Sequence, residues 1–348
     1  MDMAGQQQTI LWIGHGKSNM TAHKKALFLG KKLLRILSLL VVICFVSFLL
    51  IKNSPIDPVQ AYVSGDMLNV GPEQREKIAE YWGLNDPLMV QFTKWFTSLL
   101  RGDLGISMIY RVPVLDIIKE RFVNSMILMS ISWVLSGIFG FLLGVLAAMK
   151  KDTIIDRVIK TFCYLLASTP TFWFGLLMLM FFSVYLGWFP VGLSSPAGVL
   201  QEDVTLLERL RHLVLPALTL SILGVSSIAL HTRQKLIEVL DSDYVLFAKA
   251  RGEKGFTLFW RHGFRNILIP AITLQFAAFS ELFGGSILAE QIFSYPGLGQ
   301  ATVESGIRGD TPLLLGLVIF SSLFVFAGNF FAHILYQVVD PRTREEIS

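Results

Sequence analysis

Long apolar stretches that carry almost no charge constrain this chain more than any other feature. A helix needs about 20 apolar residues to cross the roughly 30 Å of hydrocarbon in a bilayer. Windows of about that length occur at residues 33–51, 122–149, 161–187, 213–232, 266–289 and 313–338. We therefore predict an all-α polytopic membrane protein with six transmembrane helices, the third kinked at Pro170.

The composition supports this fold class. Apolar residues make up 53% of the chain and charged residues 16%, and a soluble fold of this composition would expose too much apolar surface. The net charge of +4 comes from basic residues between the apolar windows, so nucleic acid is not expected as a partner. Cys44 and Cys163 both lie inside apolar windows and are expected to be small core residues.

The distribution of lysine and arginine orients the predicted helices. Residues 150–160 and 233–265 hold four and seven basic residues, whereas residues 188–212 and 290–312 hold two and one. Short loops rich in lysine and arginine remain on the cytoplasmic side of a membrane. We therefore expect a multi-pass membrane protein with both termini in the cytoplasm.

These windows divide the chain into five segments. The first apolar window has no small-residue cleavage site after it, which favours an uncleaved anchor over a secretory signal. The polar leader is compatible with disorder or with a translation start at Met20. The expected segments are a cytoplasmic leader (1–30), the first transmembrane helix (31–52), an external helical segment (53–121), a five-helix core with a cytoplasmic loop at 233–265 (122–339), and a cytoplasmic tail (340–348).

The external segment is too long for a plain connector and is predicted to form a small helical cap. Residues 71–74 are expected to open one helix, and residues 83–87 to separate it from a second that ends near Leu100. The second helix has an apolar face made of Met89, Phe92, Trp95, Phe96 and Leu99. That face either packs on the bundle or docks a soluble partner.

Catalytic and metal-binding patterns are missing from the sequence. Gly16, Lys17 and Ser18 resemble the end of a phosphate-binding loop, but Leu11 stands where that loop needs a glycine. The six histidines include no pair four residues apart and no cysteine or carboxylate at ligand spacing. We predict no catalytic residues, no metal site and no cofactor bound by this chain.

Glu281 is an acidic residue well inside a predicted span. A carboxylate in the membrane costs a few kcal/mol unless it is paired, hydrated or protonated. Two interpretations are open: Glu281 faces a transport cavity, or it is protonated or bonded to a neighbouring helix. Its neighbours Ser280, Gly284 and Gly285 are polar or small. We therefore predict that Glu281 and these three residues form part of the translocation path.

The cytoplasmic loop at 241–270 is the most informative segment. Residues 245–251 lack helix breakers and glycines follow, so two short helices joined at Gly252 to Gly255 are predicted. A helical hairpin of this kind can lie in a groove of a partner protein. The alternative is a solvated basic loop.

In this loop the chain resembles the permeases of ABC importers, in particular the oligopeptide, dipeptide and nickel transport family. The resemblance covers about residues 31–344. The loop, called the EAA loop in that family, is matched by Tyr244, Val245, Ala248, Ala250, Gly252, Arg261, His262, Arg265, Asn266 and Pro270. Leu246 departs from the general motif, which has a glutamate there. Further matches lie at residues 55–58, 83–87, 101–105, 168–173, 290–299 and 340–342.

The resemblance implies a type I ABC importer permease fold that works by alternating access. It implies ATPase coupling by Tyr244, Ala248, Ala250, Arg251, Gly252, Gly255, Arg261, His262 and Pro270, and an external mouth near Glu290, Pro296, Gly297 and Gly299. The implied partners are a second homologous permease, two ATP-binding subunits that hold ATP and Mg²⁺, an extracytoplasmic substrate-binding protein and membrane lipid.

The implied substrates are oligopeptides, dipeptides, or nickel and other metal chelates. A secondary transporter driven by an ion gradient is the alternative, because it also needs several spans and a carboxylate in the membrane. Inverted internal repeats would favour that alternative, and the sequence shows none. A membrane-embedded enzyme is less favoured, since no catalytic constellation is present.

Overall fold

The described part of the chain is helical. The structure, a computed structural model, describes residues 22–53, 59, 71–81, 85–196, 198–199 and 203–339. Extended pairing in these residues is limited to one bridge between Ile106 and Pro113, which confirms the all-α prediction for them. Most of the predicted leader (1–21), the matched motif at 55–58 and the predicted tail (340–348) lie outside the described residues.

The chain divides into two compact units, residues 1–44 and 45–348. The described part of the first unit is the beginning of α1 (Ala22–Lys52). The second unit contains the end of α1 and then α3 (Pro72–Tyr81), α4 (Leu88–Leu100), α5 (Val114–Met149), α6 (Ile154–Ala167), α7 (Thr171–Met178), π-helical η1 (Leu179–Tyr185), α8 (Leu206–Leu240), α9 (Asp243–Ala250), α10 (Gly255–Leu258), π-helical η2 (Phe259–Gly263), α11 (Phe264–Ala277), α12 (Phe279–Ile292), α13 (Leu298–Arg308) and α14 (Thr311–Val339).

Several described helices have the length and apolarity of membrane spans. Two qualify without interruption, α5 and the Thr311–Ala332 part of α14. Three bent pairs qualify when each is taken as one span: α6 with α7 and η1, the two halves of α8, and α10 to α11 with α12. In α1 the apolar stretch found among the described residues is shorter, Leu37–Lys52. Between two and five spans are thus supported by length and composition, and the number six stays a prediction.

Two of the predicted spans are interrupted rather than continuous. The axes of α6 and α7 differ by 108°, far more than the kink expected at Pro170. Pro170 precedes α7 as its N-cap, and a proline disfavours the helical conformation of the residue before it. The axes of α11 and α12 differ by 52° at Ala278, although no proline or glycine stands at that break. The windows 161–187 and 266–289 are therefore each broken into helices set at an angle.

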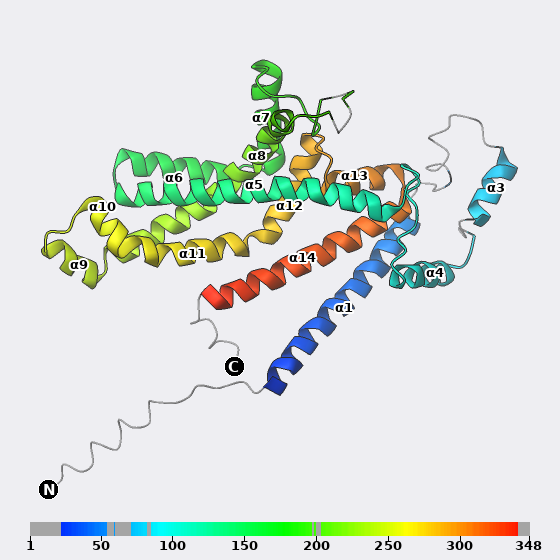
Figure 1. The fold of residues 1–348 in the computed structure, drawn as a ribbon, viewed down its shortest axis with the longest axis horizontal. Helices are drawn as coiled ribbons and strands as arrows, with labels where there is room; N and C mark the ends of the chain where they lie inside the picture. The colour runs from blue at the N-terminus through cyan, green and yellow to red at the C-terminus, as the bar shows by residue number, and fades with distance from the viewer. Residues whose placement is uncertain are drawn as a thin grey trace, which may run out of the picture. The chain divides into compact units, whose positions relative to one another are not determined.

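Helices α5 and α8 form the most extensive helix pair in the second unit (Figure 1). Two glycines one turn apart on α5 allow their backbones to approach. A Cβ atom on Gly140 would lie 2.8 Å from the Cβ of Ile228, and one on Gly144 would lie 2.6 Å from the carbonyl oxygen of Ala229. Only glycine fits these positions, which is typical of closely packed membrane helices.

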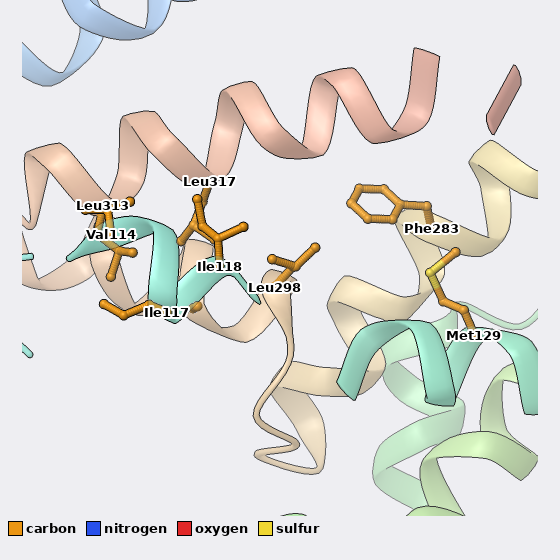
Figure 2. Packing of buried hydrophobic residues seen from close by; sticks show 9 residues of the cluster. Val114, Ile117, Ile118, Met129, Phe283, Leu298, Leu313 and Leu317 are labelled. Carbon is orange, nitrogen blue, oxygen red and sulfur yellow. The ribbon is translucent and has the colours of Figure 1, made fainter. Parts of the chain in front are cut away.

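A hydrophobic cluster joins the N-terminal part of α5 to α12, α13 and α14. Figure 2 shows its labelled members: Val114, Ile117, Ile118 and Met129 of α5, Phe283 of α12, Leu298 of α13, and Leu313 and Leu317 of α14. A Cβ atom on Gly316 would lie 2.6 Å from Cγ1 of Val114, so α14 also approaches α5 through a glycine. This cluster holds α13 and the beginning of α14 against the N-terminal part of α5.

Helices α3 and α4 occur where the sequence predicts them. The ring of Phe92 on α4 lies 5.3 Å from that of Phe45 and 5.5 Å from that of Phe48, and Trp95 stacks on Phe48 at 6.1 Å. The apolar face of α4 therefore packs on the end of α1, which favours the packing interpretation over docking of a soluble partner. Met89 on the same face remains 60% exposed.

We expect Gly144→Ala to destabilise the protein by forcing α5 away from α8. The added methyl would meet a backbone carbonyl that has no freedom to move, and overpacking of this kind costs about 1–3 kcal/mol. Thermal unfolding in lipid nanodiscs should show a lower midpoint. Gly284→Ala is the matched control, because nothing lies within 4 Å of its added Cβ. Equal midpoints for the two variants would contradict this account of the α5 and α8 contact.

Candidate functional site

The chain between α8 and α11 forms a helical hairpin, residues 241–263, made of α9, α10 and η2. Figure 1 shows it beside the C-terminal end of α5, whereas α13 lies toward the other end of that helix. The two short helices predicted from the sequence are present, with their connection at residues 251–254. Gly252 has φ of +93° and Gly255 of +58°, a region that favours glycine. The glycines therefore permit the sharp turn.

The inner face of the hairpin is apolar and packs on the end of α8. Val245, Ala248 and Leu258 form a small buried cluster against Val239 and Leu240. Lys249 donates a hydrogen bond of 2.9 Å to the carbonyl oxygen of Leu240. The hairpin and the C-terminal end of α8 are thus one packed element.

Four large aromatic side chains of the hairpin are exposed, and they are here called the aromatic face: Tyr244, Phe247, Phe256 and Trp260. The exposed fraction is 76% for Phe247, 67% for Phe256 and 59% for Trp260. Trp260 stacks on Phe264 with ring centroids 4.6 Å apart, which holds it against the start of α11. Apolar groups gathered on an exposed, rigid element mark an interaction surface rather than a solvated loop.

Polar contacts close the hairpin. The carboxylate of Glu253 accepts hydrogen bonds from Nε2 of His262 at 3.0 Å and Nη1 of Arg261 at 2.9 Å. These bonds, that from His262 foremost, hold the pKa of Glu253 below its usual value. Asn266 donates to the hydroxyl of Tyr244 at 3.1 Å and to the carbonyl oxygen of His262 at 2.8 Å. The turn is therefore tied to both of its helices.

The remaining residues predicted for ATPase coupling lie around this hairpin. Arg251 ends α9 with an exposed side chain, and Ala250 is exposed beside it. Pro270 lies inside α11 and is half-buried. The structure brings the predicted set together along one continuous segment, and its role in coupling stays a prediction.

A buried ion pair fixes the start of α6 to α8. Asp156 is fully buried, and its carboxylate accepts hydrogen bonds from Nε and Nη2 of Arg233 at 2.6 and 2.7 Å. The backbone amide of Asp152, which has φ of +65°, donates to the same carboxylate at 3.0 Å. An exposed pair, Lys151 with Asp241 at 3.0 Å, lies nearby in the sequence. The spacing of the basic residues in the sequence indicates orientation only, and it carries no signal for this pair.

A cavity of about 280 Å³ lies among α5, α6, α7, α8, α11 and α12, next to the break between α6 and α7 and the break between α11 and α12. Glu281 and Gly285 line it, as one of the two interpretations of Glu281 expected. Ser280 does not line it and donates a hydrogen bond of 2.6 Å to Asn329 on α14. Gly284 is exposed, with nothing within 4 Å of an added Cβ. Of the four residues predicted for the path, two line the cavity, and Ser280 and Gly284 do not.

The predicted external mouth residues surround a buried carboxylate. Glu290 is fully buried and accepts hydrogen bonds from the hydroxyl of Ser125 at 2.6 Å and the amide of Gly299 at 2.7 Å. Ser125 accepts from the amide of Leu298 at 2.8 Å. A Cβ on Gly297 would collide with the Glu290 carboxylate. Glu290 therefore holds the N-terminus of α13 in place and does not itself face solvent.

Pro296 is part of the same anchored turn, since its carbonyl oxygen accepts a hydrogen bond of 2.8 Å from Asn124 on α5.

A second polar network lies nearby. The hydroxyl of Tyr110 donates to Glu304 at 2.9 Å, and Arg121 donates to Gln300 at 2.9 Å. Burial, together with the bond to Glu304, raises the pKa of Tyr110, so the phenol remains a donor.

Comparisons with known proteins agree over nearly the whole chain. Residues 140–345 match a family described as "Binding-protein-dependent transport system inner membrane component", and residues 26–129 match its N-terminal segment. The chain is 35% identical over 318 residues to the oligopeptide transport system permease protein AppB of Bacillus subtilis (strain 168), which covers 91% of this chain and 99% of that protein.

Two further similarities support the assignment of the fold and the family. The chain is 34% identical over 319 residues to the glutathione transport system permease protein GsiC of Salmonella choleraesuis (strain SC-B67), covering 90% of this chain and 97% of that protein. A chain in the inward-facing structure of the MetNI methionine ABC transporter superposes with a TM-score of 0.52 at 15% identity, covering 65% of this chain and 97% of that chain.

We expect Asp156→Ala to be strongly destabilising, because it leaves Arg233 without its counter-charge in a buried site. Removing one partner of such a pair costs about 3–5 kcal/mol. The double variant Asp156→Leu with Arg233→Met should lose less than the sum of its two single changes. Lys151→Ala, which breaks the exposed pair with Asp241, should cost less than about 1 kcal/mol. Denaturant unfolding measures each variant, and additive losses in the double variant would refute the coupling.

We expect acid to loosen the hairpin by protonating Glu253. Its folded pKa is lowered, so the stabilisation is complete above the unfolded value of about 4.3 and is lost as the pH falls through the folded pKa. Hydrogen exchange of residues 253–258, corrected for intrinsic rates, should accelerate in that acid range. Glu253→Gln should exchange fast already at neutral pH. Identical exchange in the variant and the wild type at neutral pH would show that these bonds do not hold the turn.

Proposed function

The chain belongs to the family of binding-protein-dependent transport system inner membrane components, and from this membership we propose how it couples to ATP, what it assembles with and what it carries. It is a multi-pass membrane permease of an ATP-driven importer and performs no bond chemistry itself. ATP hydrolysis belongs to partner subunits. Nothing in the comparisons supports the alternative of a transporter driven by an ion gradient.

We propose that the chain crosses the membrane six times, through α1, α5, the α6 to η1 pair, α8, the α11 to α12 pair and α14. The length and apolarity of α5 and α14 support two of these crossings, and the three bent pairs support three more. The sixth rests on the apolar window at 33–51. In this arrangement the hairpin and both termini face the cytoplasm, and α3, α4 and α13 lie on the outer side, as the distribution of basic residues favours.

The hairpin is proposed to receive the movement of the ATP-binding subunits. The observation that carries this proposal is its construction: an apolar inner face packed on α8, and an aromatic face whose four side chains remain 49–76% exposed. A rigid element attached to a long helix transmits a push at its tip into the membrane. Because Asp156 and Arg233 join α8 to α6, the same movement reaches both walls of the cavity.

The proposed assembly contains this chain, a second homologous permease, two ATP-binding subunits with ATP and Mg²⁺, and an extracytoplasmic substrate-binding protein. The second permease completes the path on the other side. The binding protein delivers substrate at the outer end, near the turn held by Glu290 and the segment that contains α3 and α4. The chain itself is proposed to bind no cofactor.

Peptides are the proposed substrates. The printed names of the relatives refer to oligopeptides and to glutathione, a short peptide, and their similarity extends over 90% or more of this chain. Nickel or other metal chelates remain a second candidate only through the resemblance of the sequence motifs, and none of the relatives described above is named for nickel.

The decisive experiment is uptake by proteoliposomes that contain the complete importer. Wild-type uptake of peptide should require ATP, the ATP-binding subunits and the loaded binding protein. Phe247→Ser should lower uptake and the stimulation of ATP hydrolysis at least tenfold, because it removes the most exposed member of the aromatic face. Its unfolding midpoint should not change, since the side chain is 76% exposed in the chain alone.

Leu206→Ser is the matched control, because Leu206 is 73% exposed at the opposite end of α8. It should leave uptake and ATP hydrolysis at wild-type levels. Gly252→Asp, which forces a non-glycine residue into φ of +93°, should reproduce the effect of Phe247→Ser. Uptake by the chain alone under an ion gradient, or normal coupling in Phe247→Ser, would overturn the proposal.

A further inference from the structure

The cavity next to the two helix breaks has an unusual electrostatic character. Glu281 is the only ionisable residue in its lining, and no lysine, arginine or histidine lines it. Within the described residues Glu281 makes no hydrogen bond and no ion pair. The carboxylate lies in the first turn of α12, where the helix dipole favours a negative charge. The carboxyl group of Glu281 therefore faces the cavity, and no basic side chain lines the cavity beside it.

Three hydroxyl groups on the cavity wall offer acceptors, because their hydrogens are already used. The hydroxyl of Thr169 donates its hydrogen to the carbonyl oxygen of Leu165 at 2.7 Å, and that of Ser227 donates to Gly224 at 3.3 Å. Each hydroxyl has one hydrogen, so what remains for a ligand is the lone pairs of its oxygen. The hydroxyl of Ser136 likewise donates to Trp133, at 3.0 Å.

Gln275 fits the same pattern. Its amide nitrogen is engaged, donating to the carbonyl oxygen of Trp133 at 2.6 Å and to Ser136 at 3.2 Å. Its side-chain oxygen is buried and has no hydrogen-bond partner. The cavity lining therefore combines one carboxyl group, that of Glu281, with several acceptor groups whose hydrogens are already used.

A ligand that matches this lining is a donor with positive charge. A primary ammonium group carries three donors and no acceptor, whereas a carboxylate offers acceptors only and would be repelled by Glu281. The volume of about 280 Å³ is just below that of ordinary small-molecule pockets, so it suits one end of a peptide rather than a whole chain.

We propose that this cavity binds the free amino terminus of the transported peptide, with Glu281 as the residue that selects it. The proposal rests on the proposed function as a peptide permease and adds a point of specificity inside the membrane. The two breaks, at 168–170 and at Ala278, place the site where backbone turns line a cavity, as in other transporters with broken helices.

The test uses the complete importer in proteoliposomes and three peptides of one length with uncharged side chains except as stated. The first has a free amino terminus, the second is N-acetylated, and the third is N-acetylated and carries one lysine. Loading of the binding protein with each peptide is measured first and matched. In the wild type, uptake per ATP hydrolysed should be at least tenfold higher for the first peptide than for the second.

Glu281→Gln should remove this preference by lowering uptake of the free-amino peptide about tenfold, with ATP hydrolysis stimulated as in the wild type. Glu281→Asp, which keeps the carboxyl group, should retain part of the preference for the free-amino peptide. Glu76→Gln is the matched control, because Glu76 is exposed on α3 and does not line the cavity. An unchanged preference in Glu281→Gln would overturn the proposal, as would an equal effect of that change on the acetylated lysine peptide.

A second measurement does not depend on the stability of the Glu281 variants. Ser227→Cys places a thiol on the cavity wall, and the native Cys44 and Cys163 are buried. Peptide with a free amino terminus, delivered by the binding protein, should slow labelling of this thiol at least fivefold, and the acetylated peptide should not. Equal protection by both peptides would refute the site. Wild-type uptake that needs no ATP would instead refute the proposed function, so the two failures are distinguishable.

Discussion

The requirement that every backbone amide and carbonyl inside hydrocarbon find a partner governs this structure. Water is not available there, so a spanning segment must be helical or must line a cavity where its helix is interrupted. The α5 and α14 helices meet the requirement without a break. The breaks at Pro170 and Ala278 instead adjoin the cavity of about 280 Å³, so the interrupted backbone and the polar lining occur together.

Rigid connections join the hairpin to these helices. Tight glycine contacts join α5 to α8, the Asp156 and Arg233 pair joins α6 to α8, and the hairpin packs on the last turn of α8. Buried ion pairs contribute little net stability but fix one geometry, because any other arrangement leaves a charge unpaired. Helix α8 is therefore the element that joins the hairpin to α5 and α6, and in the proposed mechanism it carries a push on the hairpin into the membrane.

Much of this arrangement is encoded locally and could be predicted from the sequence. The glycines at 252 and 255, the helices α3 and α4, and the apolar windows follow from nearby residues. The break at Ala278 could not be predicted, since no proline or glycine marks it. Asp156 and Arg233 lie 77 positions apart, and Glu290 finds Ser125 across 165 positions. Such pairings arise from tertiary packing, and a single sequence read without an alignment of its relatives carries no signal for them.

The aromatic face has a consequence for the life of the protein in the cell. Phe247, Phe256 and Trp260 meet water whenever the chain stands alone, and surfaces of this kind favour self-association. If the chain is made in excess of its partner subunits, every surplus copy exposes its aromatic face. The cell must therefore match the production of all subunits or degrade the unassembled copies. This requirement follows from the same aromatic side chains that are proposed to bind the partner.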